Sequence, residues 1–132
     1  MIRRVTVEDI PRALEMAAAA YPERRVAMGE DWARWVIGHP DRICLISDEA
    51  LGVASIVTRY GHERRAQLDL LASLNPRSFD PVRMLRAMIE WARSRQAVGA
   101  FKIDSDTGVD FGPFVRRLGG RAVTNKRYEV LL

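Results

Sequence analysis

Two hydrophobic periods run along this chain, and they separate predicted strands from predicted helices. Short apolar runs rich in β-branched side chains predict strands, because alternate strand residues face opposite sides of a sheet. These runs cover residues 2–7, 43–47, 51–58, 66–74, 101–103, 121–124 and 128–132. The strongest helical repeat lies within residues 82–96, at Val82, Leu85, Met88, Ile89 and Ala92. Its i, i+3, i+4, i+7 spacing predicts a helix that packs one face on the sheet.

Three more helices are predicted from their end signals. Thr6 and Asp9 have capping-box spacing, and Tyr21-Pro22 ends the helix that follows them. Its predicted apolar face consists of Ile10, Leu14, Ala17 and Ala18. Residues 31–37 predict a short helix with Trp32 and Trp35 on one face, for which packing on the sheet is favoured over the lining of a ligand cleft. Residues 110–118 predict the last helix, closed by Gly119-Gly120.

The order of these elements predicts one α/β (α+β) domain that covers residues 1–132. The three runs between residues 43 and 74 are separated by short polar turns, which predicts an antiparallel meander. The whole pattern predicts a mixed, mostly antiparallel sheet of six to seven strands, with about four helices on its two faces. At 132 residues and 48% apolar content, the chain is long enough for one substantial core.

Composition excludes several classes of protein. Cys44 is the only cysteine and stands in an apolar run, so an internal disulfide is impossible and an inert thiol is expected. With two histidines, both beside turn signals, we expect no metal site. No apolar run reaches the roughly 20 residues of a membrane span, and the first residues lack the apolar core of a secretion signal, so we expect a cytoplasmic protein.

The net charge of +4 comes almost wholly from arginine, because Lys102 and Lys126 are the only lysines. Arginine suits bidentate contacts with phosphate or carboxylate, so an anionic ligand is conceivable. A nucleic-acid partner is not favoured, because the chain has no basic tail and no interleaving of aromatic and basic residues.

The junction between the strand at 66–74 and the helix at 82–96 is a candidate anion site. A strand that leads into a helix N-terminus brings unpaired backbone N–H groups and the positive end of the helix dipole together. The loop contains no glycine, however. Asp80 stands at the predicted N-cap and Pro81 at the first helical position, so a carboxylate and a missing donor occupy the place that a phosphate would need.

Three local segments carry a family resemblance together with the order of the elements. They are Ile2-Arg3-Arg4-Val5-Thr6-Val7-Glu8-Asp9-Ile10, Met84-Leu85-Arg86-Ala87-Met88-Ile89-Glu90-Trp91-Ala92 and Phe114-Val115-Arg116-Arg117-Leu118-Gly119-Gly120. Over nearly the full chain, the pattern resembles the GNAT acyltransferase superfamily. The first segment is similar to the first strand and helix start of that family, the second to its cofactor-side helix, and the third to its last helix and closing turn.

The resemblance implies acetyl transfer from acetyl-CoA to a small-molecule or protein amine. It implies that the pantetheine arm lies along Leu71, Ala72 and Ser73, and that the pyrophosphate lies at the loop and helix start, near Arg77, Ser78 and Arg83. Asp69 is the only carboxylate that the strand offers as a base. Three positions depart from the family pattern: the loop glycines expected near Phe79 and Pro81 are absent, Val115 stands at the usual tyrosine, and Gly108 stands at an asparagine.

Each candidate has a structural alternative. Asp69 is also explained as a polar, outward-facing strand residue, and the arginines as a solvated helix face. Turn and cap chemistry explains Asp104, Asp106 and Asp110 better than a metal site does. For the whole chain, the alternative to an acyltransferase is a catalytically silent GNAT-like binding or structural protein, associating with itself or with a larger assembly. Nucleic-acid binding ranks third.

Overall fold

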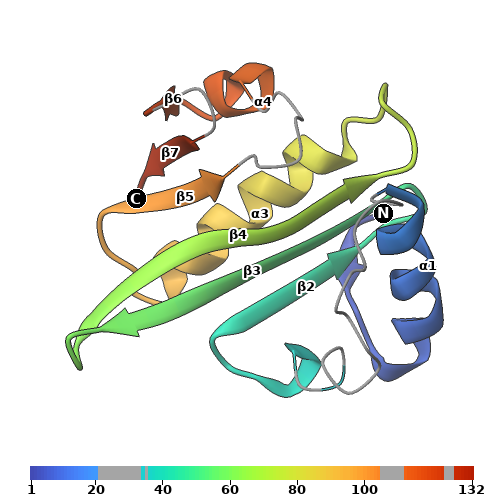
Figure 1. Ribbon diagram of the computed structural model, residues 1–132, viewed down its shortest axis with the longest axis horizontal. Helices are drawn as coiled ribbons and strands as arrows, with labels where there is room; N and C mark the ends of the chain where they lie inside the picture. The colour runs from blue at the N-terminus through green and yellow to red at the C-terminus, as the bar shows by residue number, and fades with distance from the viewer. Residues whose placement is uncertain (21–33, 35, 105–111, 124–126) are drawn as a thin grey trace.

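The computed structural model describes residues 1–20, 34, 36–104, 112–123 and 127–132 (Figure 1). The predictions for Trp32, Trp35, Asp106, Gly108 and Asp110 concern positions outside these residues. No helix in the described part of the chain combines the length and the apolar content needed to cross a membrane.

In the described residues, one mixed sheet of seven strands, in the order β1-β2-β3-β4-β5-β7-β6, forms the centre of the molecule. Its strands are β1 (Arg3–Arg4), β2 (Arg42–Ile46), β3 (Ala50–Arg59), β4 (Glu63–Ser73), β5 (Ala100–Asp104), β6 (Arg121–Ala122) and β7 (Arg127–Leu131). Only β4 and β5 pair in parallel, and the other neighbours are antiparallel. The predicted meander and the predicted mixed, mostly antiparallel sheet are confirmed.

Helices cover both faces of this sheet. After the short 3-10 helix η1 (Val7–Asp9) come α1 (Ile10–Ala20), α3 (Asp80–Ser94) and α4 (Gly112–Arg117), and residues 36–38 are also helical. In Figure 1, α3 passes behind β4, and α1 stands at the right-hand end of the sheet.

Two apolar clusters show which helix covers which face. One cluster, here called the α3-side core, joins α3 residues such as Met84 and Leu85 to Leu45, Ala50 and Leu71. The other, called the α1-side cluster, joins α1 residues to sheet residues that directly follow these along the strands, namely Ile46, Leu51 and Ala72. Because successive strand residues face opposite sides, α1 and α3 lie on opposite faces.

The N-terminal segment differs in detail from the prediction. The first strand covers only Arg3–Arg4, although Val5 N still donates a hydrogen bond of 2.9 Å to Cys44 O. The capping signal is confirmed, since Asp9 Oδ2 accepts a hydrogen bond of 2.8 Å from Thr6 N. The apolar face of α1 was partly wrong. Ala18 is exposed and Leu14 half-buried, while Ile10, Ala13, Met16 and Ala17 are buried.

The strongest predicted helix is confirmed, with its start one residue earlier than expected. Helix α3 covers Asp80–Ser94, so Phe79 is the N-cap and Pro81 the second helical residue, not the first. Phe79 has helical dihedral angles and makes no side-chain capping bond. The expected N-cap was therefore wrong, because Asp80 directs its carboxylate to another element, as described below.

Candidate functional site

The strands β4 and β5 are in register over only two residue pairs. Ala66 pairs with Phe101 and Gln67 with Lys102, and no further pair between the two strands occurs in the described part of the chain. Strand β4 continues for six residues beyond Gln67, to Ser73, still paired with β3. The sheet thus parts along the second half of β4.

A β-bulge lies at the point where the two strands part. Val53 of β3 pairs with Leu70, while the next residue, Ala54, pairs with Leu68, so Asp69 is the extra residue. Leu68 packs against the α3-side core and Leu70 against the α1-side cluster, so β4 changes its facing pattern here. A bulge leaves its extra residue out of the ladder and turns the strand, and such features concentrate near active sites.

The carboxylate of Asp69, the candidate base, has two partners at this bulge. Arg42 Nη1 donates to Asp69 Oδ2 at 3.2 Å, and Gln67 Nε2 donates to Asp69 Oδ1 at 3.0 Å. Residue Asp69 is exposed overall, yet its side chain is only 19% exposed, so its backbone carries much of the exposed surface. The carboxylate is therefore oriented by neighbours and remains reachable.

Asp69 adjoins a line of polar side chains that crosses the sheet, here called the polar row: Arg42, Ser55, Gln67, Lys102 and Glu129. Each member is the direct register partner of the next, from β2 to β7. Each also stands next to residues of the α3-side core in its strand, so alternation places the row on the opposite face. Polar side chains thus stand abreast in five strands. Ser55 is fully buried, and the other four are half-buried and offer polar groups to a ligand on this face.

The residues expected along the pantetheine arm follow the bulge directly. Leu71 and Ala72 are buried in the two opposite cores, and Ser73 Oγ donates to Asn75 O at 2.8 Å. Their side chains are thus used in packing and in the turn. Any contribution of these residues to a ligand comes from their backbone, along the part of β4 that β5 does not cover.

In the loop between β4 and α3, backbone amides donate hydrogen bonds to oxygen atoms of the loop itself. Arg77 N donates to Asn75 Oδ1 at 3.0 Å, and Ser78 N donates to Asn75 O at 3.1 Å. Asp80 N donates to Ser78 Oγ at 3.2 Å, and Pro76 and Pro81 have no amide hydrogen. Hence three of the amides that a pyrophosphate cradle would use are already bonded within the loop.

Side chains of the neighbouring β2–β3 turn hold this loop in place. Asp80 Oδ2 accepts a hydrogen bond of 2.6 Å from Ser47 Oγ, and Asn75 Nδ2 donates to Glu49 Oε1 at 3.1 Å. Hydrogen bonds from Asn75 and Ser78 lower the pKa of Glu49. Asp80, which we expected to cap its own helix, instead connects α3 to this turn.

Cationic side chains surround the loop. Arg77 and Arg83 are exposed, and Arg83 Nη1 lies 3.6 Å from Asp80 Oδ1. The Arg117 guanidinium lies 5.5 Å from the centre of the exposed Phe79 ring. An anion at this loop would therefore meet the guanidinium groups of flexible side chains in place of bare backbone amides.

Acid chemistry from α4 is missing at the expected position. Val115 is buried in the α3-side core, so it offers no proton donor. Cys44 is no substitute nucleophile, because burial raises the pKa of its thiol to about 12. Among the described residues, no group of three or more His, Cys, Asp or Glu side chains is arranged to hold a metal ion.

Sequence reasoning missed Arg42, Gln67 and Ser55. The one available signal was a polar residue within or beside each apolar run, and this pattern is common in strands that face solvent. Only the register between strands shows that the three side chains are neighbours.

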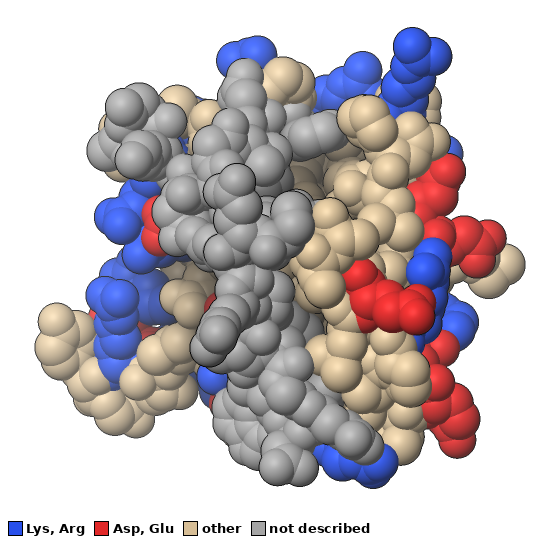
Figure 2. Space-filling view, turned by 45° about the vertical axis from the view of Figure 1, so that its right-hand side comes forward, with Lys and Arg blue, Asp and Glu red and all other residues tan. Residues whose placement is uncertain are grey.

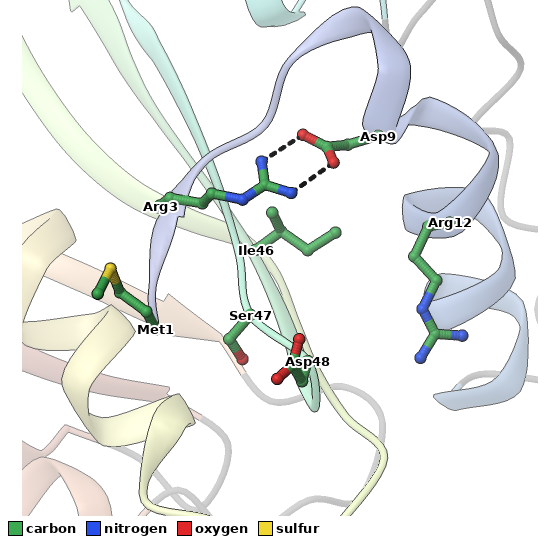
Figure 3. Close-up of a pocket in the computed structure, with 7 residues that line it drawn as sticks. All are labelled: Met1, Arg3, Asp9, Arg12, Ile46, Ser47 and Asp48. Carbon is green, nitrogen blue, oxygen red and sulfur yellow. Dashed lines mark hydrogen bonds and ion pairs between the residues drawn. The ribbon is translucent and has the colours of Figure 1, made fainter.

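A separate cavity of about 260 Å³ lies at the N-terminal edge of the sheet (Figure 3). One wall is the bidentate pair of Arg3 and Asp9, with distances of 2.5 and 2.6 Å. Arg12 of α1 and Asp48 of the β2–β3 turn lie on opposite sides of the space. Hydrogen bonds from Arg3 and Thr6 hold the pKa of Asp9 well below its usual range. The Arg3 and Asp9 side chains that form this wall of the cavity thus satisfy each other's charge and hydrogen-bonding groups.

The net charge is spread over the surface. In the view of Figure 2, Asp and Glu side chains gather on the right, whereas Lys and Arg side chains stand around the outline. The described surface in that view does not form one basic face of the kind that a nucleic-acid reader presents.

Comparison with known proteins identifies the fold. Neither a protein-family model nor a curated protein sequence matches the chain. Solved structures do match. A GNAT-family acetyltransferase from Streptococcus pneumoniae has a TM-score of 0.73 at 9% identity, over 98% of this chain and 95% of its own. An aminoglycoside 6'-N-acetyltransferase from Acinetobacter baumannii has a TM-score of 0.68 at 18% identity, over 82% and 80%.

A protein described as a transcriptional regulator, from Bacillus halodurans, also matches, with a TM-score of 0.73 at 15% identity, over 94% of each chain. The chain therefore has the GNAT acetyltransferase fold, as the resemblance in the sequence predicted. Identities this low establish the fold, and a fold by itself does not fix an activity.

Proposed function

We propose that this protein is a GNAT-type N-acyltransferase that moves an acetyl group from acetyl-CoA to an amine by direct attack in a ternary complex. The observation that supports this most is the bulge at Asp69, at the point where β4 leaves β5. A parted strand presents backbone groups to an extended ligand, and the bulge places an oriented carboxylate beside it. We place the reaction in the cytoplasm.

In the proposed reaction the amine nitrogen attacks the thioester carbonyl carbon. A C–N bond forms and the C–S bond breaks, so that coenzyme A leaves as a thiolate that takes a proton from water. The attacking nitrogen loses one proton to Asp69, directly or through a water molecule. Arg42 and Gln67 hold the carboxylate in position for this transfer.

The cofactor would be held without a glycine loop. In this proposal the pantetheine arm follows the backbone of Leu71, Ala72 and Ser73, and the phosphates meet the guanidinium groups of Arg77 and Arg83. The Ser78 hydroxyl is a further candidate donor. Because flexible side chains replace preformed amides, we expect weak binding that falls with added salt.

The first test is binding of acetyl-CoA, by calorimetric titration and thermal shift at moderate ionic strength. We expect a stabilising shift at millimolar ligand, reduced in Arg77→Ala and unchanged in Arg93→Ala, whose side chain pairs with Glu90 on the exposed face of α3. Absence of both heat and shift at millimolar acetyl-CoA would exclude the proposal.

The second test concerns Asp69. Asp69→Asn keeps the size of the side chain and removes the base, so we expect kcat to fall by about 10² to 10⁴ while acetyl-CoA binding is retained. The matched control is Asp48→Asn, which changes an exposed carboxylate in the β2–β3 turn. Equal rates for the wild type and Asp69→Asn would remove Asp69 from the mechanism.

One observation favours a second candidate, a GNAT-like binding or structural protein without cofactor chemistry. The loop amides of Arg77, Ser78 and Asp80 are all bonded within the loop. A protein that does not bind the cofactor has no need for unbonded amide donors at this loop. Mass measurement in solution together with a pull-down distinguishes the two: a strict monomer that acetylates an amine contradicts this second candidate.

A further inference from the structure

A groove of about 320 Å³ lies on the sheet beside the polar row. We call it the basic groove, and its main lining residues are Val57, Arg59, Arg65, Gln67, Lys102 and Arg127. Ala66, Phe101 and Ile103 belong to the α3-side core. In the strands, Arg65 and Gln67 flank Ala66, and Lys102 lies between Phe101 and Ile103. Alternation therefore puts the groove on the face opposite α3.

The charge of this groove is mainly positive. Among its described lining residues, four side chains are cationic and Glu129 is the one carboxylate. Three of the cations have acidic neighbours: Arg65 pairs with Glu63, while Asp104 lies 3.3 Å from Lys102 Nζ and 2.8 Å from Arg127 Nε.

Two further charges complete this arrangement. Glu129, the lining carboxylate, is neutralised by Arg121 at 2.6 Å. Arg59 makes no side-chain ion pair within the described part of the chain, and it is exposed at the end of β3. The carboxylates near the groove are thus all in ion pairs with cations, and positive charge is left over for an anionic ligand.

The groove and the candidate base adjoin one another. Gln67 lines the groove and also donates its Nε2 hydrogen to Asp69 Oδ1 at 3.0 Å. Lys102 is the register partner of Gln67 on the next strand. Lys102 lies across from Gln67 at the roughly 5 Å spacing of paired strands, and Asp69 follows Gln67 by two residues, roughly 7 Å along β4. A molecule the size of an amino acid reaches from the carboxylate at the bulge to the cations of the groove.

We propose that the basic groove binds the acceptor, and that the acceptor is a small amine that carries at least two carboxylates. This inference rests on the proposed acyl transfer and adds the chemical class of its second substrate. The amine lies at Asp69 and a carboxylate lies beside Lys102, while Arg65 and Arg59 add positive charge farther along the groove. A polycationic amine would bring ammonium groups against the same side chains and is disfavoured.

The test measures the binding of amino acids to the protein in the absence of acetyl-CoA, by two-dimensional ¹H–¹⁵N NMR at low ionic strength. L-glutamate is compared with L-glutamine, which lacks the side-chain charge, and with L-lysine, which reverses it. We expect glutamate to shift the amide signals of Gln67, Lys102 and their neighbours at millimolar concentration, with weaker binding of glutamine and weakest of lysine. Equal affinities for the three compounds would overturn the inference.

Two variants locate the site. Lys102→Gln and Arg59→Gln each remove one cation, and we expect glutamate affinity to fall roughly threefold to tenfold in Lys102→Gln and by less in Arg59→Gln, which lies farther from Asp69. Arg59→Gln is the safer variant, because Arg59 is exposed and outside the ion pairs described above. The control Arg93→Gln removes the same charge on α3. Equal weakening by the control would show a general charge effect and contradict a groove site.

Failure of this inference is separable from failure of the proposed function. Selective glutamate binding in a protein that does not bind acetyl-CoA would support an anion-binding groove and reject acyl transfer. Acetyl transfer to polyamines or L-lysine, with glutamate inactive as acceptor, would support acyl transfer and reject the acceptor class.

Discussion

At the scale of single residues, two buried serines have opposite surroundings. Ser47 Oγ donates to Asp80 Oδ2 at 2.6 Å and accepts from the amides of Ala50 and Glu49 at 3.1 and 3.3 Å. Ser55 is fully buried in β3, and its Oγ has no hydrogen-bond partner among the residues that the structure describes. A buried hydroxyl without a partner is unfavourable, whereas a satisfied one connects the elements around it.

Replacing each serine by alanine should therefore have opposite effects. Ser47→Ala leaves the Asp80 carboxylate without its partner and should lower the free energy of unfolding by about 2 kcal/mol. Ser55→Ala removes an unsatisfied group and should raise it by up to about 1 kcal/mol. Urea unfolding of both variants measures the difference, and each serves as the control for the other. A similar loss in both would contradict the hydrogen-bond assignment.

The ion pair of Asp9 with Arg3 predicts a pH dependence. The folded-state pKa of Asp9 is depressed by hydrogen bonds from Arg3 and Thr6, so its stabilising contribution is present above the unfolded pKa of about 3.9 and is lost as the pH falls below it. We expect Asp9→Asn to destabilise the protein at pH 7 and to differ less from the wild type at pH 2.5. Unfolding at both pH values tests this, with Asp48→Asn as the control. A constant difference would contradict the assignment.

At the scale of elements, the connection from α4 to β6 depends on two glycines for different reasons. Gly119 has φ of 75°, the left-handed conformation that ends helices. Gly120 is required by space, because an added Cβ would lie 2.5 Å from Val115 Cγ1 and 2.6 Å from Glu129 O. The closing Gly-Gly signal is thus confirmed, and its second glycine seats α4 against β7.

Gly120→Ala should lower the free energy of unfolding by about 1 to 3 kcal/mol, because backbone as well as side chain must move. Gly38 is the matched control: no described atom lies within 4 Å of a Cβ added there, and it has helical conformation. Gly38→Ala should be neutral or slightly stabilising. Thermal unfolding of both compares them, and a harmless Gly120→Ala would mean that α4 is not seated as described.

At the scale of the whole molecule, β5 joins the two halves of the sheet. It pairs with β4 through two residues and with β7 through five, and its second residue, Phe101, is fully buried in the α3-side core. Residues of α3 and of β7 share this core. If the chain is one domain, as the sequence predicts, we expect it to unfold in a single transition.

We expect far-UV circular dichroism and tryptophan fluorescence to report one coincident urea transition. Phe101→Ala should lower the free energy of unfolding by about 3 to 5 kcal/mol and should move both signals together. Two separated transitions, or a Phe101→Ala variant in which only one signal moves, would contradict the single-domain prediction.

The sequence by itself determined most elements and their order, because local periodicity and end signals suffice for them. The apolar repeat from Val82 to Ala92 is confirmed as α3, and the Thr6–Asp9 spacing is confirmed as a cap. Errors occurred where a local rule had competitors. Asp80 was expected to cap its own helix, but Ser47 from a distant turn takes its carboxylate.

Only the tertiary structure decided the site. The bulge at Asp69, the parting of β4 from β5 and the polar row follow from the register between strands, which joins residues as distant as Arg42 and Glu129. Register is set by the packing of whole faces, and no local pattern contains it. The sequence could name Asp69 as the available carboxylate; the fold supplied its partners, Arg42 and Gln67, and the groove beside it.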